Sequence, residues 1–126
     1  MVSSLEENRR DPFRERLEVA VPLYLGRFKY SAEAIKAMIE NPQDRGAVAA
    51  QAAESLGCKL HGIWWAFGDH DGAFLLEAPD NVAAVALAMA VGASGQISTE
   101  TTALLDMDEA QEAMRRAATA TFRPPR

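Results

Sequence analysis

Residues 58–80 read CKLHGIWWAFGDHDGAFLLEAPD, and this stretch decides the fold of the chain. Apolar residues flank the glycine-bounded turn 68–72 and indicate strands at 59–67 and 73–78. Because the turn is short, the two strands should pair as an antiparallel hairpin. Asp80, directly after the second strand, is a typical N-cap and predicts that a helix follows.

The alternation of side chains along the hairpin predicts what each of its faces carries. Pairing Phe67 with Gly72 sets the register and puts His61 on the core side, where we expect a hydrogen-bonded structural histidine. That side is the better core because its residues are large and apolar, namely Ile63, Trp65, Phe67, Phe74 and Leu76. The opposite face carries Gly62, Trp64, Ala66, Ala73, Leu75 and Glu77.

The segment before the hairpin predicts one strand and a broken helix. Residues 19–30 alternate as a strand, with Tyr24, Gly26, Phe28 and Tyr30 on one side and Leu23, Leu25, Arg27 and Lys29 on the other. Ser31 then caps a helix, Asn41-Pro42 restarts it with the proline at the first helical position, and Gly57 ends it.

The segment after the hairpin predicts a helix, a strand and a final helix. The helix that follows Asp80 should turn one apolar face to the core and end in the small residues 92–95. Residues 96–105 are rich in β-forming side chains and suit an edge strand. Asp106 with Glu109 resembles a capping box. The apolar face expected for the helix after Asp80 consists of Val82, Val85, Ala86 and Met89.

This order, βαββαβ with an extra C-terminal helix, predicts an α+β, ferredoxin-like sandwich with a four-stranded antiparallel sheet. We expect a charged extension at 1–18, the ferredoxin-like domain at 19–106, and a C-terminal helix and tail at 107–126. Helices that pack on one face of the sheet leave the other face uncovered. The leucines and Trp64 on that uncovered face make it too apolar to be left wholly in water. Face-to-face pairing into a homodimer of the α+β barrel type would cover it. A monomer whose N-terminal extension covers the same surface is the alternative.

Composition limits the classes of protein to consider. With 126 residues, 48% hydrophobic and 25% charged, the chain has the make-up of one soluble globular domain. A net charge of −5 and the lack of a basic stripe argue against nucleic acid as a partner. Cys58 is the only cysteine, which favours a buried thiol and a reducing cytoplasm. The apolar run 82–91 is too short to span a membrane, and the charged residues 1–18 do not form a signal peptide.

Several short motifs, spread over residues 20–105, resemble the GYD domain family. A glycine and an aspartate of its Gly-Tyr-Asp pattern correspond to Gly68 and Asp71, while His70 stands where tyrosine is usual. The resemblance implies a small ferredoxin-like domain, akin in shape to dimeric α+β barrel proteins, and no defined activity. The motifs are Tyr24 to Tyr30, Asn41-Pro42, Leu56-Gly57, Leu60 to Trp64, Ala66-Phe67-Gly68, His70-Asp71 and Glu77-Ala78-Pro79-Asp80.

Two groups of polar residues are candidates for chemistry. Asp69, His70 and Asp71 offer carboxylates and an imidazole, but neighbouring side chains in a tight turn diverge, so we interpret them as turn residues and predict no metal site. Glu77 projects onto the apolar open face, where burial would raise its pKa and Arg27 or Lys29 on the next strand would lower it. Glu77 is therefore either a general base or part of an interfacial ion pair.

Two hypotheses follow from the open face. The first is a homo-oligomeric module that is structural or holds a small molecule beside Trp64, Leu75 and Gly62, with Gly62 leaving room for a ligand or for a partner's Trp64. The second is an enzyme that needs no cofactor and acts on a small aromatic or polyketide-like substrate. In this enzyme Glu77 would be the general base, Arg27 or Lys29 would stabilise the charge that develops, and Trp64 would be the platform for the substrate.

Overall fold

The computed structural model describes residues 21–126, so the extension 1–18 and the expected strand start at Val19 lie outside the described residues. Two compact units divide the described part, one of residues 21–104 and one that begins at Leu105. The first contains the sheet, and the second contains the helix α6 (Met107–Ala117).

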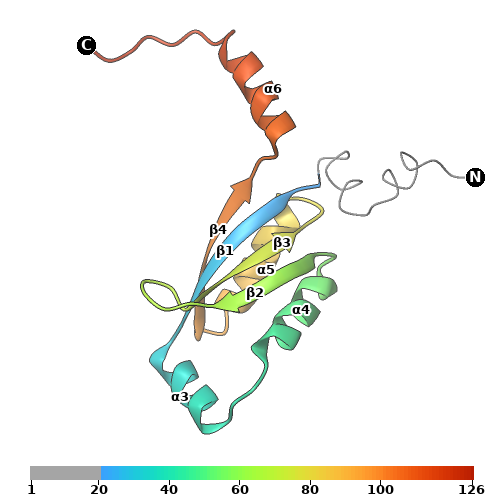
Figure 1. The fold of residues 1–126 in the computed structure, drawn as a ribbon, viewed down its shortest axis with the longest axis vertical. Helices are drawn as coiled ribbons and strands as arrows, with labels where there is room; N and C mark the ends of the chain where they lie inside the picture. The colour runs from blue at the N-terminus through green and yellow to red at the C-terminus, as the bar shows by residue number, and fades with distance from the viewer. Residues whose placement is uncertain (1–20) are drawn as a thin grey trace, which may run out of the picture. The chain divides into compact units, whose positions relative to one another are not determined.

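The first unit is an α+β domain whose strands form a four-stranded antiparallel sheet in the order β2-β3-β1-β4. This order and the βαββαβ succession are compatible with a ferredoxin-like fold. Strand β4 lies at an edge, as predicted. The elements, shown in Figure 1, are β1 (Leu23–Tyr30), α3 (Ala32–Glu40), α4 (Arg45–Ser55), β2 (Lys59–Trp65), β3 (Gly72–Glu77), α5 (Asn81–Gly92) and β4 (Ile97–Leu104).

Most of the predicted helix boundaries are confirmed. The side chains of Ser31 and Asp80 accept hydrogen bonds from the backbone N–H groups three residues later, over 3.1 and 2.8 Å. In the second unit, Asp106 and Glu109 form the predicted capping box at the start of α6. Gly57 has φ 73°, a left-handed conformation that suits glycine after a helix end.

The predicted helix start at Asn41-Pro42 is wrong. Asn41 instead closes α3, since its N–H donates to the carbonyl of Ala37. Helix α4 begins only at Arg45, because the Asp44 carboxylate accepts the N–H of Gly46 over 2.9 Å and is the cap. A proline directly after a helix end is common because it cannot continue the helix.

The register of the hairpin differs from the predicted one by two residues. Gly72 pairs with Trp65 rather than Phe67, and Phe67 lies fully exposed in the loop. The ladder ends earlier because the N–H of Ala66 donates to the carbonyl of Asp71, which closes a longer loop. A shift of two residues by itself moves no side chain to the other face, since side chains alternate with a period of two.

One irregularity in β2 does change a face. Leu60 pairs with Leu76 while Gly62 pairs with Leu75, so His61 is an extra residue in the ladder, a β-bulge. His61 contacts Glu77, whose side chain lies on the face opposite Leu76. The prediction that His61 lies on the core side is therefore wrong.

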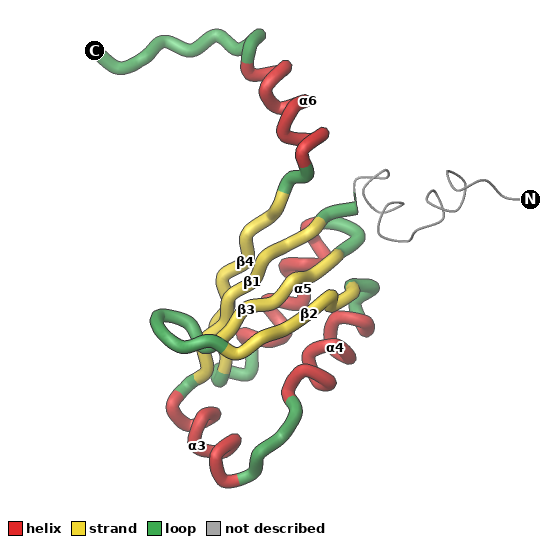
Figure 2. The backbone as a smooth tube through the Cα atoms, in the orientation of Figure 1, coloured by secondary structure: helices red, strands yellow, loops and turns green. Residues whose placement is uncertain are grey.

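The core lies between the sheet and the helices α4 and α5, which cover one face only (Figures 1 and 2). Helix α5 is apolar on all sides, and the face that it buries is not the predicted one. Ala84 packs into the core with Leu87 beside it, whereas Val82, Val85 and Met89 are exposed. Despite this apolar character, none of the helices within residues 21–126 has the length and hydropathy to cross a membrane. The buried residues of the core cluster are Tyr24, Ala53, Cys58, Leu76, Ala78 and Ala84.

Candidate functional site

The predicted site residues all lie on the face of the sheet opposite to the core, which we call the open face. The register aligns Leu25 with Leu75 and Leu23 with Glu77, and the buried side chains of β1 alternate with these. Trp64 opposes Ala73, and Gly62 opposes Leu75, on the same face. The strands' regular alternation thus brings these residues together as predicted.

His61 and Glu77 form the most defined polar contact of the open face. The imidazole Nε2 lies 3.2 Å from Oε1 of Glu77, and the two side chains are only 19% and 18% exposed. The bulge in β2 produces this contact, since it turns His61 toward the carboxylate. A carboxylate that holds one ring nitrogen of a histidine fixes its tautomer and orientation, an arrangement that suits proton transfer.

Trp64 provides an aromatic surface next to this pair. Its indole lies over Gly62, where a Cβ atom would come within 2.5 Å of the ring carbon Cη2. The space left by Gly62 is therefore filled by Trp64 of the same strand in this structure. The indole remains 59% exposed, so most of its surface is open to a ligand or a partner.

The two predicted cations of β1 lie away from Glu77. Arg27 pairs in register with Ala73, four residues along β3 from Glu77, which corresponds to roughly 13 Å along a strand. The cation opposite Glu77 is instead Lys59 at the start of β2. Sequence reasoning missed Lys59, because its pairing with Glu77 depends on the register of the hairpin and on the bulge at His61.

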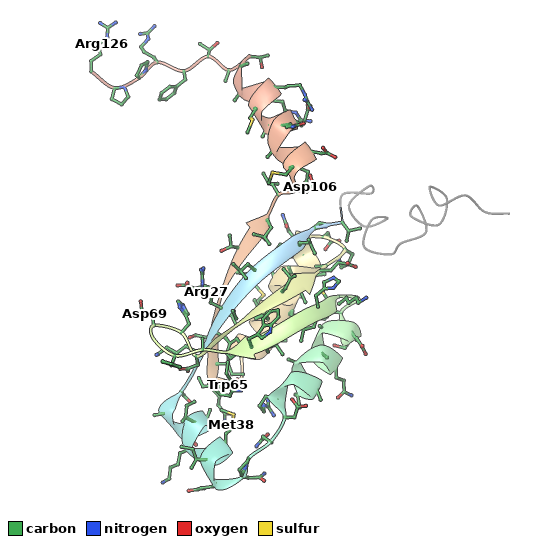
Figure 3. The ribbon with its side chains drawn as sticks, in the orientation of Figure 1. Arg27, Met38, Trp65, Asp69, Asp106 and Arg126 are labelled. Carbon is green, nitrogen blue, oxygen red and sulfur yellow. The ribbon has the colours of Figure 1, made fainter. Side chains whose placement is uncertain are left out.

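The turn residues hold the β2–β3 loop in place. Asp71 accepts the N–H of Tyr30 on its carboxylate and donates its own N–H to the carbonyl of Phe28, both over 2.8 Å. His70 Nε2 lies 3.2 Å from Oε2 of Glu100 on β4. Asp69 is exposed at the loop (Figure 3). Within residues 21–126, no three His, Cys, Asp or Glu side chains gather as a metal-binding group.

A second candidate site, which sequence reasoning missed, lies on the core side. A cavity of about 130 Å³ lies between the sheet and the helices α4 and α5. Small side chains create it, because alanines of both helices face large residues of the strands without filling the gap. The alanine content of 47–53 and 83–90 was the available signal. The walls include Phe28, Ile63 and Leu76 of the sheet, Ala49 and Ala52 of α4, and Ala88 of α5.

Two ionisable groups belong to the core itself. The hydroxyl of Tyr24 donates to Oδ1 of Asn81, which ties β1 to the start of α5. Burial raises the pKa of Tyr24, and the Asp80 carboxylate raises it further. Burial and Asp80 also raise the pKa of the Cys58 thiol. Cys58 is buried, as predicted, and a raised pKa makes a thiol a poor nucleophile.

Comparisons with known proteins identify a family for most of the chain. The family model described as GYD domain matches residues 24–114, which include all of the sheet except Leu23 and most of α6. A search of curated proteins found no match.

Proposed function

We propose, on the premise that this chain belongs to the GYD domain family, that it is a homo-oligomeric module which binds a small molecule between paired open faces. The observation that carries the proposal is the make-up of the open face. Half-buried Leu25 and Leu75 lie side by side in the middle of this face with Leu23 toward its Glu77 end, and Trp64 is largely exposed, while α4 and α5 pack on the other side. Apolar patches of this kind mark interaction sites in soluble proteins.

A second copy of the same face is the partner that fits best. Two apolar centres can pack together, and the cations of one copy can meet the carboxylates of the other, because Arg27 and Lys29 lie at one end and Glu77 at the other. A two-fold axis between the copies places the Arg27 and Lys29 end of each copy against the Glu77 end of the other, so each contact occurs twice. The interface would be of the α+β barrel type.

The ligand that this face favours is small, planar and capable of hydrogen bonds. The exposed indole of Trp64 offers a stacking surface, and the His61–Glu77 pair offers a donor and an acceptor beside it. Trp64 fluorescence in a Trp65→Phe variant, titrated with hydroxylated aromatic compounds, tests this directly. Saturable quenching that disappears in His61→Ala supports the site, and quenching that persists there contradicts it.

The oligomer is tested by its mass in solution. Light scattering after gel filtration should give a mass above 13.7 kDa that falls toward the monomer in Leu25→Glu. Val82→Glu is the matched control, since Val82 is exposed on α5 outside the open face. A monomeric wild-type protein, or dissociation caused only by Val82→Glu, would contradict pairing through the open face.

The His61–Glu77 contact favours a second candidate, a cofactor-independent enzyme for small aromatic or polyketide-like substrates. If Glu77 holds Nε2–H, the other ring nitrogen of His61 is the base and Glu77 orients it, rather than being the base itself. Such a base would take a proton from an acidic C–H bond to give an enolate. The test is deuterium exchange of acetylacetone in heavy water, followed by NMR. Exchange that is lost in His61→Gln with the oligomer intact supports the enzyme, and unchanged exchange refutes it.

A further inference from the structure

We propose that the cavity on the core side binds a small carboxylic acid whose apolar part is about the size of one aromatic ring, and that Arg45 holds the carboxylate. This site is separate from the open face, and the proposal is independent of oligomerisation.

The size of the cavity fits one ring. The cavity has a volume of about 130 Å³ and is partly open to solvent. An apolar cavity of about 150 Å³ stays dry and admits benzene. The cavity here is of the same order, and it is open at one side rather than sealed, so a ring can enter.

The lining fits an apolar body. Side chains of Phe28, Ile63 and Leu76 form the floor on the sheet, and Leu87 and Ala88 of α5 form a wall. The lining is mostly apolar, so water there finds few of the two to four polar partners that it needs. A hydrocarbon ring has no hydrogen bonds to lose in such a space, and it gains van der Waals contacts with the walls.

The charge comes from Arg45, the one lysine or arginine among the lining residues. Its guanidinium donates to the neutral Oε1 of Gln43 over 3.2 Å, and it forms no ion pair with any carboxylate of residues 21–126. The neighbouring carboxylate, Asp44, is used as the helix cap. Arg45 also occupies the first position of α4, where a positive charge is unfavourable and an anion is favourable. A ligand carboxylate bound to Arg45 would offset the unfavourable positive charge at the start of α4 and would accept a charge-assisted hydrogen bond from the guanidinium.

Wild-type protein with labelled methyl groups gives the first test, using 3-phenylpropanoate as the probe. Binding in the cavity should shift the methyl signals of Ile63, Leu76 and Leu87 saturably. The methyl signals of Leu25 and Leu75 on the open face should stay unchanged. Shifts confined to the open face, or no saturable shift, would overturn the proposal. This test needs no variant.

Variants then separate the ring from the carboxylate. Ala88→Leu should fill the cavity, weaken binding by about tenfold or more and raise the melting temperature, while Ala90→Leu, exposed on the same helix, should change neither. Arg45→Gln should weaken 3-phenylpropanoate about tenfold and leave 3-phenylpropanamide unchanged, with the exposed Arg123→Gln as its control. Phenethylamine that binds as tightly as the acid, or Ala88→Leu that still binds the acid fully, would refute the proposal.

Discussion

The two faces of the sheet use the same strands for different purposes. The core side carries large apolar side chains, including a cluster of aromatic rings in which Tyr30 and Trp65 stack at 5.4 Å. The open face carries both leucines and charged residues and holds the His61–Glu77 pair. Removal of a side chain should therefore cost folding stability on the core side, and association or ligand binding on the open face. This contrast can be tested with neighbouring residues of one strand.

Leu76 and Leu75 provide the comparison with the largest expected effect. Leu76 is 1% exposed, so Leu76→Ala should lower the free energy of unfolding by about 2–5 kcal/mol. Leu75→Ala, half-buried on the other face, should cost about 1 kcal/mol. Urea denaturation at several protein concentrations measures both. Equal losses at low concentration would show that the two faces do not differ in this way.

Asp71 and Asp69 extend the comparison to the loop that joins the two hairpin strands. Asp71→Ala removes the acceptor of the Tyr30 N–H and should lower the free energy of unfolding by about 1.5–3 kcal/mol. Asp69→Ala, exposed in the same loop, should stay within about 0.5 kcal/mol of wild type. Chemical denaturation again gives the values. A cost at Asp69 as large as at Asp71 would contradict the anchoring role of Asp71.

Gly72 and Gly62 compare tight packing on the two faces. A Cβ atom at Gly72 would lie 2.1 Å from the Phe28 ring and 2.4 Å from the backbone oxygen of Trp64. Backbone cannot move aside as a ring can, so Gly72→Ala should cost about 1–3 kcal/mol. At Gly62 the three atoms nearest to an added Cβ all belong to the exposed indole of Trp64, which can rotate away, so Gly62→Ala should cost less. Thermal unfolding ranks the two, and the reverse order would be evidence against this packing.

The smallest expected effect concerns high pH and the core alone. The pKa values of Tyr24 and Cys58 are raised in the folded protein, so the unfolded chain loses these protons first as the pH rises. The stabilising effect of the two groups is complete at neutral pH and should decline between about pH 8 and pH 11. The melting temperature across this range is the measurement. The double variant Tyr24→Phe, Cys58→Ala should show a smaller fall of melting temperature with pH. An unchanged fall would refute the assignment of the effect to these two groups.

Much of the fold could be predicted because the signals are local. The caps at Ser31, Asp80 and Asp106 depend on a side chain and a backbone group three residues apart, and all three are confirmed. The face of each hairpin residue from Gly62 onward follows from alternation, and this prediction survived the register error at Gly72 because the shift was even. The residues of the open face were predicted together for the same reason.

The errors arose where the sequence has no local signal. Nothing in the residues around His61 marks a bulge, since it depends on how β2 meets β3. Helix α5 is apolar on every side, so its pattern could not decide between Val82 and Ala84 as the buried face. The cavity depends on the distance between two helices and the sheet. Only its small side chains are visible in the sequence.

The bulge at His61 makes the length of β2 as important as its composition. A substitution at His61 can remove the imidazole, but it leaves the ladder as it is. Deletion of one residue between Leu60 and Gly62 would instead restore regular pairing, with a core-facing and an open-facing residue in strict succession. Insertions and deletions in this strand, as well as substitutions of His61 or Glu77, would therefore create or abolish the imidazole–carboxylate contact.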